Sequence, residues 1–125
     1  MRDRIPPSGS RFPPRTHSLI LLGTCAADGA YPGGGLIFDK ARNLYGTDSS
    51  AGNLSDCDQS GCGTVFELVP TSAGIWRQVT LYSFQGETDG GSPAANLVMD
   101  TNGNLYGTAP AGGDYSYGVI FELIP

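Results

Sequence analysis

Two closely spaced cysteines are the first residues that could do chemistry. Cys57 and Cys62 lie in the segment D-C-D-Q-S-G-C-G, with four residues between them. A disulfide at this spacing would close a loop, and disulfides persist in oxidising compartments. The alternative is a pair of free thiols. A zinc site is disfavoured, because it would need a second closely spaced pair of Cys or His ligands. We therefore predict a disulfide, with the remaining cysteine, Cys25, in a half-buried strand.

Acidic side chains form a second group, because glycoside cleavage uses two carboxyl groups roughly 5 to 10 Å apart. The acids that recur at equivalent places are Asp28, Asp39, Asp89 and Asp100. Aspartate before glycine or at a strand end is more often a turn former than a catalyst. His17 is the only histidine and lies near the N-terminal end, which gives little support to a nucleophile activated by histidine. We predict no catalytic residue and no enzymatic activity.

One turn carries a pattern that could bind calcium. The residues Asp100-x-Asn102-x-Asn104 resemble the start of a calcium loop, where alternate residues supply oxygen ligands. The rest of the pattern fails, because the sixth position is Leu105 rather than glycine and the twelfth is Ala111 rather than glutamate. The sequence therefore predicts a hairpin turn at this place, and neither a metal nor another cofactor.

Aromatic residues are the remaining candidates for ligand contact, because their rings can stack on sugars or peptides. Tyr115 and Tyr117 follow two glycines in a Gly-rich segment, and Trp76 is the only tryptophan. We predict these three as ligand-binding residues, with a glycan or a protein as the ligand. Tyr45 and Tyr106 occupy equivalent strand positions, so we expect them to pack between sheets.

Composition and charge limit the partners of the chain. Glycine contributes 19 of 125 residues and charged residues only 15%, against about 25% in typical soluble domains. Residues 1–17 carry a net charge of +3, whereas residues 18–125 carry −8. An acidic body disfavours nucleic acids and anionic membrane surfaces, which need clustered Lys and Arg. No stretch approaches the roughly 20 apolar residues of a transmembrane helix.

The chain contains an internal repeat, which identifies the elements that must position these residues. At an offset of 61, ten of the 28 residues in 20–47 are identical to those in 81–108, including N-L-Y-G-T in both copies. At an offset of 55, G-T-V-F-E-L-V-P at 63–70 matches G-V-I-F-E-L-I-P at 118–125. The difference between the offsets places an insertion, at residues 53–62, in the first copy.

Each repeat breaks into short runs of strand-forming residues. Residues 96–100 and 105–108 flank an Asn-Gly turn and should pair as an antiparallel hairpin. Residues 119–124 and 75–84 supply further runs, and no segment keeps a helical spacing of apolar residues. We predict an all-β fold of two four-stranded antiparallel meander repeats, which resemble β-propeller blades and form a partial propeller.

The sequence resembles the GloVer tandem-repeat family of large bacterial proteins. The motifs are D-x-x-G-N-L-Y-G-T at 100–108, G-[TV]-[VI]-F-E-L-x-P in both copies, and V-T-L-Y-S-F-x-G-x-x-D-G-x-x-P at 79–93. The resemblance covers residues 18–125 and implies propeller-like blades and export or surface anchoring. It brings no catalytic residues with it.

These patterns divide the chain into three parts. Residues 1–17 form a basic, Pro-rich leader that we expect to be disordered, residues 18–76 the first repeat, and residues 77–125 the second. The apolar run at 19–22 is too short for a convincing signal peptide, although it loosely fits a lipoprotein signal. Two repeats are too few for a closed propeller. We therefore expect a fragment of a longer array, a ring subunit that self-associates through exposed strand edges, or a compact two-sheet unit.

Two functions follow from these features. The first is a non-enzymatic, extracytoplasmic β-repeat module that serves in binding or as a structural spacer. The alternative is part of a larger carbohydrate-active propeller enzyme whose catalytic residues lie outside this chain. A degenerate reading frame without independent stability is a third possibility.

Overall fold

A computed structural model describes residues 29–57, 59–72 and 74–124. The leader at 1–17, the apolar run at 19–22, His17, Cys25 and Asp28 lie outside the described residues.

The described residues form β-strands and no helix, which confirms the all-β prediction. Strand-rich runs of Val, Ile, Phe, Tyr and Thr suit the pleated, half-buried surface of a sheet. The strands are β1 (Ala30–Pro32), β2 (Ile37–Phe38), β3 (Leu44–Ser50), β4 (Thr64–Pro70), β5 (Trp76–Ser83), β6 (Val98–Met99), β7 (Leu105–Ala109) and β8 (Val119–Leu123).

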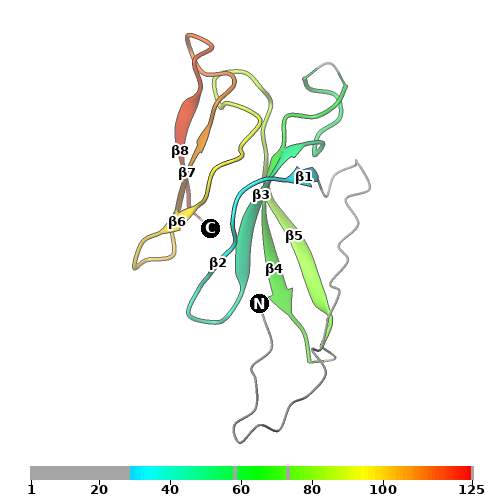
Figure 1. Cartoon of the computed structure of the whole chain (residues 1–125), viewed down its shortest axis with the longest axis vertical. Coiled ribbons are helices and arrows are strands. Elements are labelled where there is room, and N and C mark those ends of the chain that lie inside the picture. The colour runs from blue at the N-terminus through cyan, green and yellow to red at the C-terminus, as the bar shows by residue number, and fades with distance from the viewer. Residues whose placement is uncertain (1–28, 58, 73, 125) are drawn as a thin grey trace, which may run out of the picture.

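The strands build two antiparallel sheets, which are neighbouring layers of the molecule (Figure 1). In the first sheet, β3 pairs with β4, and β4 pairs with β5, while β1 and β2 share the other edge of β3. In the second sheet the order is β6-β7-β8. The sheets are open rather than closed into a ring, so the propeller arrangement stays a prediction.

The register of the strands shows that the two sheets are built alike. Tyr45 lies opposite Glu67 in the first sheet, and Tyr106 lies opposite Glu122 in the second. The hairpin predicted around the Asn-Gly turn is present, since β6 pairs antiparallel with β7. Two differences separate the sheets. β1 pairs with β3, beside β2, whereas no second strand beside β6 pairs with that edge of β7 in the described residues. β5 covers the edge of β4, whereas no strand among the described residues pairs with the equivalent edge of β8.

The boundary between the sheets falls after Ser83, whereas the boundary predicted between the sequence repeats falls after residue 76. The repeat alignment begins inside β5, because Leu81 is the first residue matched to the first copy. The hydrogen bonds of β5 nevertheless run to β4, so this strand completes the first sheet. β5 thus lies at the start of the second sequence repeat but forms the last strand of the first sheet.

The two hairpin turns, K-A-R-N at 40–43 and T-N-G-N at 101–104, differ at their first three positions. Gly103 adopts a φ of 85°, a left-handed conformation that glycine reaches without steric cost. The equivalent residue in the first repeat is Arg42, which adopts a φ of 70°. The Arg42 guanidinium lies 5.4 Å from the centre of the Phe38 ring, a cation–π contact that offsets part of the backbone strain. The first turn therefore keeps its geometry without the Asn-Gly pair.

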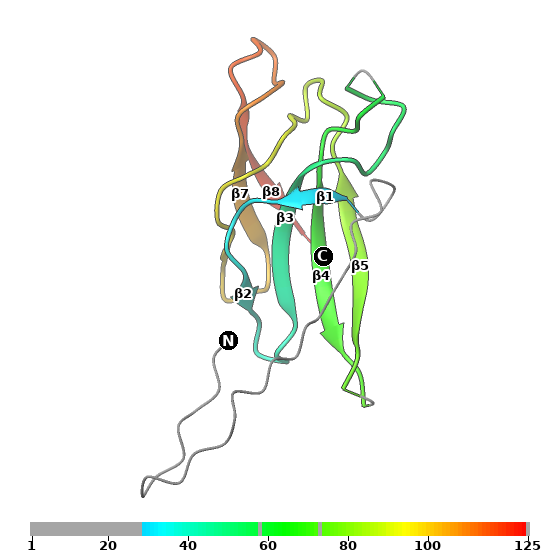
Figure 2. The same cartoon turned by 45° about the vertical axis from the view of Figure 1, so that its right-hand side comes forward.

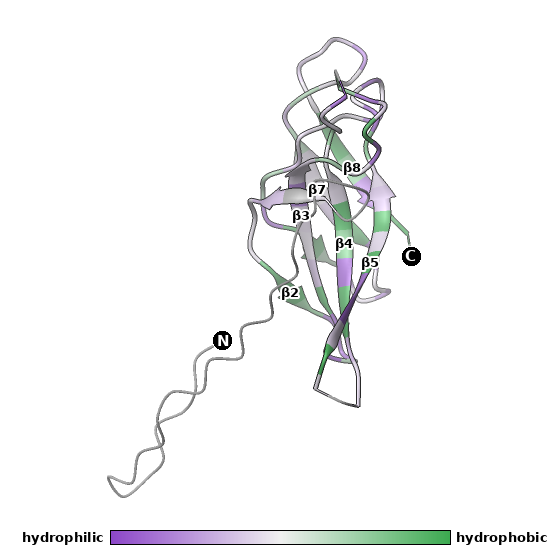
Figure 3. Cartoon of the chain, turned by 90° about the vertical axis from the view of Figure 1, so that its right-hand side faces the viewer, coloured by the Kyte–Doolittle hydropathy of each residue, from purple (hydrophilic) through white to green (hydrophobic). Residues whose placement is uncertain are grey.

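The core lies between the two sheets, which pack face to face (Figure 2). Tyr45 and Val65 of the first sheet meet Leu97, Leu105 and Ala109 of the second, all of them buried. Apolar residues run along β4 and β8, so both sheets contribute to this layer (Figure 3). A hydrogen bond of 2.6 Å from the Gly35 backbone amide to the Asn96 side chain joins the sheets at a second place.

Candidate functional site

A tyrosine hydroxyl lies between two carboxylates in each sheet. The Tyr45 hydroxyl donates to Asp39 Oδ2 at 2.7 Å and lies 3.0 Å from Glu67 Oε2. In the second sheet, the Tyr106 hydroxyl lies 2.8 Å from Asp100 Oδ2 and 3.0 Å from Glu122 Oε2. We call each group an acid–tyrosine cluster. A phenol has one proton and can donate to only one carboxylate at a time.

The aspartate of each cluster also forms the hairpin turn. Asp100 Oδ1 accepts hydrogen bonds from the backbone amides of Asn102 and Asn104, each at 2.9 Å. The Asn104 side chain donates to the other oxygen, Oδ2, at 3.1 Å. Asp39 repeats this pattern with the amides of residues 41 and 43. An aspartate that binds the backbone two residues ahead is the usual Asx turn, so these carboxylates hold the loop in shape.

The hydrogen bonds change the ionisation of the clusters. The backbone amide of Asn104 and the Tyr106 hydroxyl lower the pKa of Asp100, because both stabilise its charged form. Hydrogen bonds to Asp100 and Glu122 raise the pKa of Tyr106 to about 12. Burial raises the pKa of Tyr45 further, and the neighbouring carboxylates add to the effect. The tyrosines are therefore poor proton donors in catalysis near neutral pH.

The lowered pKa of the turn aspartates predicts a loss of stability in acid. Desolvation opposes the shift at Asp39, but hydrogen bonds led by Tyr45 outweigh it, so the pKa of this carboxyl lies below its usual 3.8. The pKa of Asp100 is lowered too, so both carboxyl groups release protons more readily in the folded state. The contribution of these two carboxyl groups to the free energy of unfolding should thus be fully present above about pH 5 and be lost as the pH drops below about 4.

Chemical unfolding at a series of pH values measures this effect. The double variant Asp39→Asn/Asp100→Asn keeps the oxygen that accepts the backbone amides in each turn, replaces the oxygen that accepts from the tyrosine by an amide nitrogen, and cannot titrate. We expect its free energy of unfolding to depend less steeply on pH below about 4 than that of the wild type. Equal slopes would show that the two carboxylates do not contribute.

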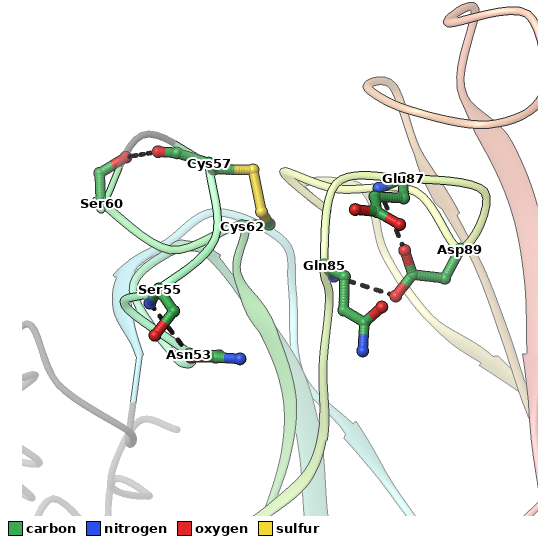
Figure 4. The surroundings of a disulfide bond; sticks show 8 residues. All are labelled: Asn53, Ser55, Cys57, Ser60, Cys62, Gln85, Glu87 and Asp89. Carbon is green, nitrogen blue, oxygen red and sulfur yellow. Dashed lines mark hydrogen bonds between the residues drawn. A yellow bond between two sulfur atoms is a disulfide. The ribbon is translucent and has the colours of Figure 1, made fainter.

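A groove of about 390 Å³ lies between the sheets. The Tyr82 hydroxyl donates to Asp89 Oδ2 at 2.7 Å inside this groove, and that hydrogen bond raises the pKa of Tyr82 to about 12. Asp89 also accepts from the backbone amides of Gln85 and Glu87, which form a tight turn (Figure 4). The remaining lining is mostly apolar: Val65, Phe84, Thr88, Val119, Ile120, Phe121, Glu122 and Leu123. The groove thus offers an apolar surface with one acidic side.

The insertion loop contains a disulfide bond between Cys57 and Cys62 (Figure 4). Cys62 is fully buried, and its carbonyl accepts a hydrogen bond of 2.7 Å from the backbone amide of Ser92. The Phe84 amide donates to the Gly63 carbonyl at 2.9 Å. The end of the loop and the residue after it are therefore bonded to the segment that joins the sheets, at its first residue and at Ser92.

The aromatic residues predicted to bind a ligand lie at two separate places. Tyr115 and Tyr117 lie in the loop between β7 and β8, where their side chains are 83% and 90% exposed. Tyr117 also borders a hollow of about 290 Å³ together with Pro110 and Ile120. Trp76 begins β5 at the other end of the molecule, next to the β4–β5 turn (Figure 1). The structure thus groups the two tyrosines but leaves Trp76 apart.

Sequence reasoning missed Glu67 and Glu122 as partners of the tyrosines. Their signal was the alternation of side chains along β4 and β8, which places each glutamate on the same face as the tyrosine opposite it. The Tyr82–Asp89 hydrogen bond was also missed. It connects a strand to the turn that follows, and both residues lie in the motif at 79–93.

The described residues contain neither a cluster of metal ligands nor a helix that could span a membrane. No group of three or more His, Cys, Asp or Glu side chains in this part of the chain is arranged to hold a metal ion. Nor does any helix in the same residues have the length and apolarity to cross a membrane.

Comparison with known proteins supports the assignment made from the repeat motifs. No curated protein and no solved structure matches the chain. The Gloeobacter/Verrucomicrobia repeat family, however, matches residues 6–125, which include both sheets and both acid–tyrosine clusters. The resemblance to GloVer repeats is thereby confirmed, and the chain belongs to the Gloeobacter/Verrucomicrobia repeat family.

Proposed function

We propose that the chain is a non-enzymatic, structural β-repeat module that works outside the cytoplasm. The observation that carries this proposal is the duplication of the acid–tyrosine cluster, whose recurring polar groups bond to one another and to their own turns. Contacts that occur in both repeats and join only groups of the same sheet serve to stabilise the fold of each repeat. An active site would instead need groups that face a substrate with open hydrogen-bonding capacity.

The ionisation of the clusters supports the same role. Glycoside cleavage needs one carboxyl group with a raised pKa as proton donor. Asp39 and Asp100 show the opposite shift, because hydrogen bonds stabilise their charged forms. Each is also tied to two backbone amides, so neither can move toward a bound sugar without opening its hairpin.

Location outside the cytoplasm is supported by the disulfide in the insertion loop. Glutathione and thioredoxin keep most cytoplasmic thiols reduced, whereas structural disulfides persist in the periplasm and at the cell surface. The net charge of −8 over residues 18–125 suits a soluble or surface-exposed module that does not adhere to nucleic acid.

An assay for glycoside hydrolysis tests the structural role against the enzymatic alternative. The full chain and its Glu67→Gln/Glu122→Gln variant are incubated with a panel of chromogenic glycosides, and thermal unfolding is followed on the same samples. We expect equal background hydrolysis and a lower melting temperature for the variant, because glutamine makes a weaker, uncharged hydrogen bond to each tyrosine. Hydrolysis by the wild type that the variant lacks would overturn the proposal.

A second candidate is ligand binding by the β7–β8 loop. The observation in its favour is the exposure of Tyr115 and Tyr117, at 83% and 90%, beside the hollow that Tyr117 borders. Retention of the chain on immobilised glycans or peptides, and its loss in a Tyr115→Ser/Tyr117→Ser variant, would establish this function. Such a result would add binding to the structural role without making the chain an enzyme.

A further inference from the structure

The second sheet has no strand in the place that β5 occupies in the first. In the first sheet, β5 pairs with β4 along the edge opposite β3. β8 is the repeat equivalent of β4, since G-T-V-F-E-L-V-P at 63–70 matches G-V-I-F-E-L-I-P at 118–125. No strand in the part of the chain that the structure describes pairs with the second edge of β8. Such an edge presents backbone N–H and C=O groups that can pair with a further strand.

The groove between the sheets runs along this free edge. Its volume is about 390 Å³, and its lining includes the whole of β8, from Val119 to Leu123. On the other side, the lining includes Val65 of β4 and Tyr82 of β5. The groove therefore lies where a further strand beside β8 would stack on the first sheet.

The burial of β8 indicates that its free edge is incompletely covered. Phe121 and Leu123 pack against the core between the sheets but are only half-buried. Leu105 lies opposite Leu123 on the neighbouring strand β7 and is 0% exposed. The repeat equivalents Phe66 and Leu68, on β4 beside β5, are 6% and 4% exposed. A strand added at β8 would remove part of this apolar surface from water, which favours binding.

We infer that the β8 edge and its groove bind the opening strand of another repeat of this family, extended and antiparallel to β8. β5 identifies the kind of strand, because it lies at the start of the second sequence repeat and pairs with the sheet before it. Addition of a strand to a free sheet edge is a common mode of peptide recognition, in which main-chain hydrogen bonds give the affinity. This inference deepens the proposed structural role, on which it rests.

The pairing of β4 with β5 predicts the register of the bound strand. Val65 lies opposite Tyr82 in the first sheet. Ile120 is the repeat equivalent of Val65. The bound strand should therefore place the residue equivalent to Tyr82 opposite Ile120.

Charge also favours a strand like β5. Arg77 is the only charged residue of β5, whereas the groove is lined by the carboxylates of Asp89 and Glu122. Opposite charges speed association and align the partners, and like charges disfavour a wrong partner. A basic strand therefore fits this groove better than an acidic one.

A fluorescently labelled peptide of residues 76–84, W-R-Q-V-T-L-Y-S-F, tests the proposal. The full chain is titrated into the peptide, and binding is followed by fluorescence anisotropy. We expect saturable binding. The control peptide carries Gln78→Pro/Thr80→Pro and should bind at least about tenfold more weakly, because proline has no N–H to donate and breaks strand pairing.

Cysteine cross-linking tests where the peptide binds. Opposite residues of an antiparallel pair have Cα atoms about 4.5 to 5.5 Å apart, which is within the range of a disulfide. In a Cys25→Ser background, the chain with Ile120→Cys should therefore form a disulfide with the peptide that carries Tyr82→Cys. Val98→Cys is the matched control, since Val98 is 64% exposed but lies on β6, at the other edge of the same sheet. We expect at least about tenfold less adduct with this control, while circular dichroism shows that both variants are folded.

Three outcomes would overturn the inference. The first is the absence of saturable binding at the highest concentration of the chain reached. The second is equal affinity for the proline peptide, which would mean that the backbone does not pair. The third is equal cross-linking at Ile120→Cys and Val98→Cys, or disulfide-linked dimers of the chain in place of the adduct, which would identify a second copy as the occupant. None of these results bears on the hydrolysis assay, so failure of strand binding is distinguishable from failure of the proposed function.

Discussion

Phe84→Ala is expected to lower the free energy of unfolding by about 3 to 5 kcal/mol, the usual cost of removing a buried phenylalanine. The Phe84 side chain is 1% exposed and makes edge-to-face contacts with two aromatic rings. Its ring centre lies 5.1 Å from that of Tyr82 in the first sheet and 5.2 Å from that of Phe121 in the second. The variant would leave a cavity at the place where the sheets meet.

Urea unfolding followed by circular dichroism measures this loss. The control is Phe38→Ala, because Phe38 is 53% exposed and its removal leaves no enclosed cavity. We expect the control to cost about 1 kcal/mol, because it removes exposed surface and the cation–π contact with Arg42 but opens no cavity. Similar values for the two variants would mean that Phe84 does not join the sheets as described.

Gly107→Val is expected to destabilise the protein by about 3 kcal/mol, near the upper end of the cost of overpacking a core. A Cβ atom at Gly107 would lie 2.5 Å from Phe121 Cζ and 2.9 Å from Leu97 Cδ2. Both distances are shorter than van der Waals contact, and Leu97 is only 2% exposed, so it has little room to move. Thermal and urea unfolding of the variant provide the measurement.

A second glycine separates crowding from backbone effects. A Cβ atom at Gly103 would meet nothing within 4 Å, but the residue has a φ of 85°. Gly103→Ala should therefore cost about 1 kcal/mol through its backbone alone.

Replacing Phe121 by leucine should make Gly107→Val less costly than it is in the wild type, because the shorter side chain frees space. If the effects of Gly107→Val and Phe121→Leu on the free energy of unfolding were additive, that result would contradict the crowding explanation.

The strands and one turn could be predicted because their signals are local. The run at 119–124 became β8, at Val119–Leu123, and the Asn-Gly pair joins β6 to β7 as expected. Alternating and β-branched residues determine strands over a few positions, and Gly103 supplies the left-handed conformation of the turn. The equivalent turn at Arg42 has no such signal and was predictable only through the repeat.

The acid–tyrosine clusters could not be predicted in full, because their members come from separate strands. Asp39 and Tyr45 lie close in sequence, but Glu67 joins them only through the register of β3 with β4. The insertion at 53–62 lies between these two strands and conceals that register in the first repeat. The second repeat, with its shorter connection, gives the same geometry around Glu122.

The sheet to which β5 belongs could not be predicted from the repeat, for a related reason. A repeat alignment identifies residues that are equivalent, but not which neighbour a strand bonds to. The bonds of β5 run to β4 across the short turn at 71–75, and the turn at Asp89 then redirects the chain toward the second sheet. Pairing between consecutive strands joined by a short turn is the commoner arrangement in antiparallel sheets.

The insertion loop has a mechanical consequence for the pair of repeats. The Cys62 carbonyl at the end of the loop accepts a hydrogen bond from Ser92 of the connecting segment, the adjacent Gly63 accepts one from Phe84, and the disulfide limits how far the loop itself can deform. A force that separates the two sheets would have to break these hydrogen bonds before the connecting segment could act as a hinge. The first repeat therefore carries a brace at its joint with the second, and the joint is stiffer than one made from the repeat motif alone.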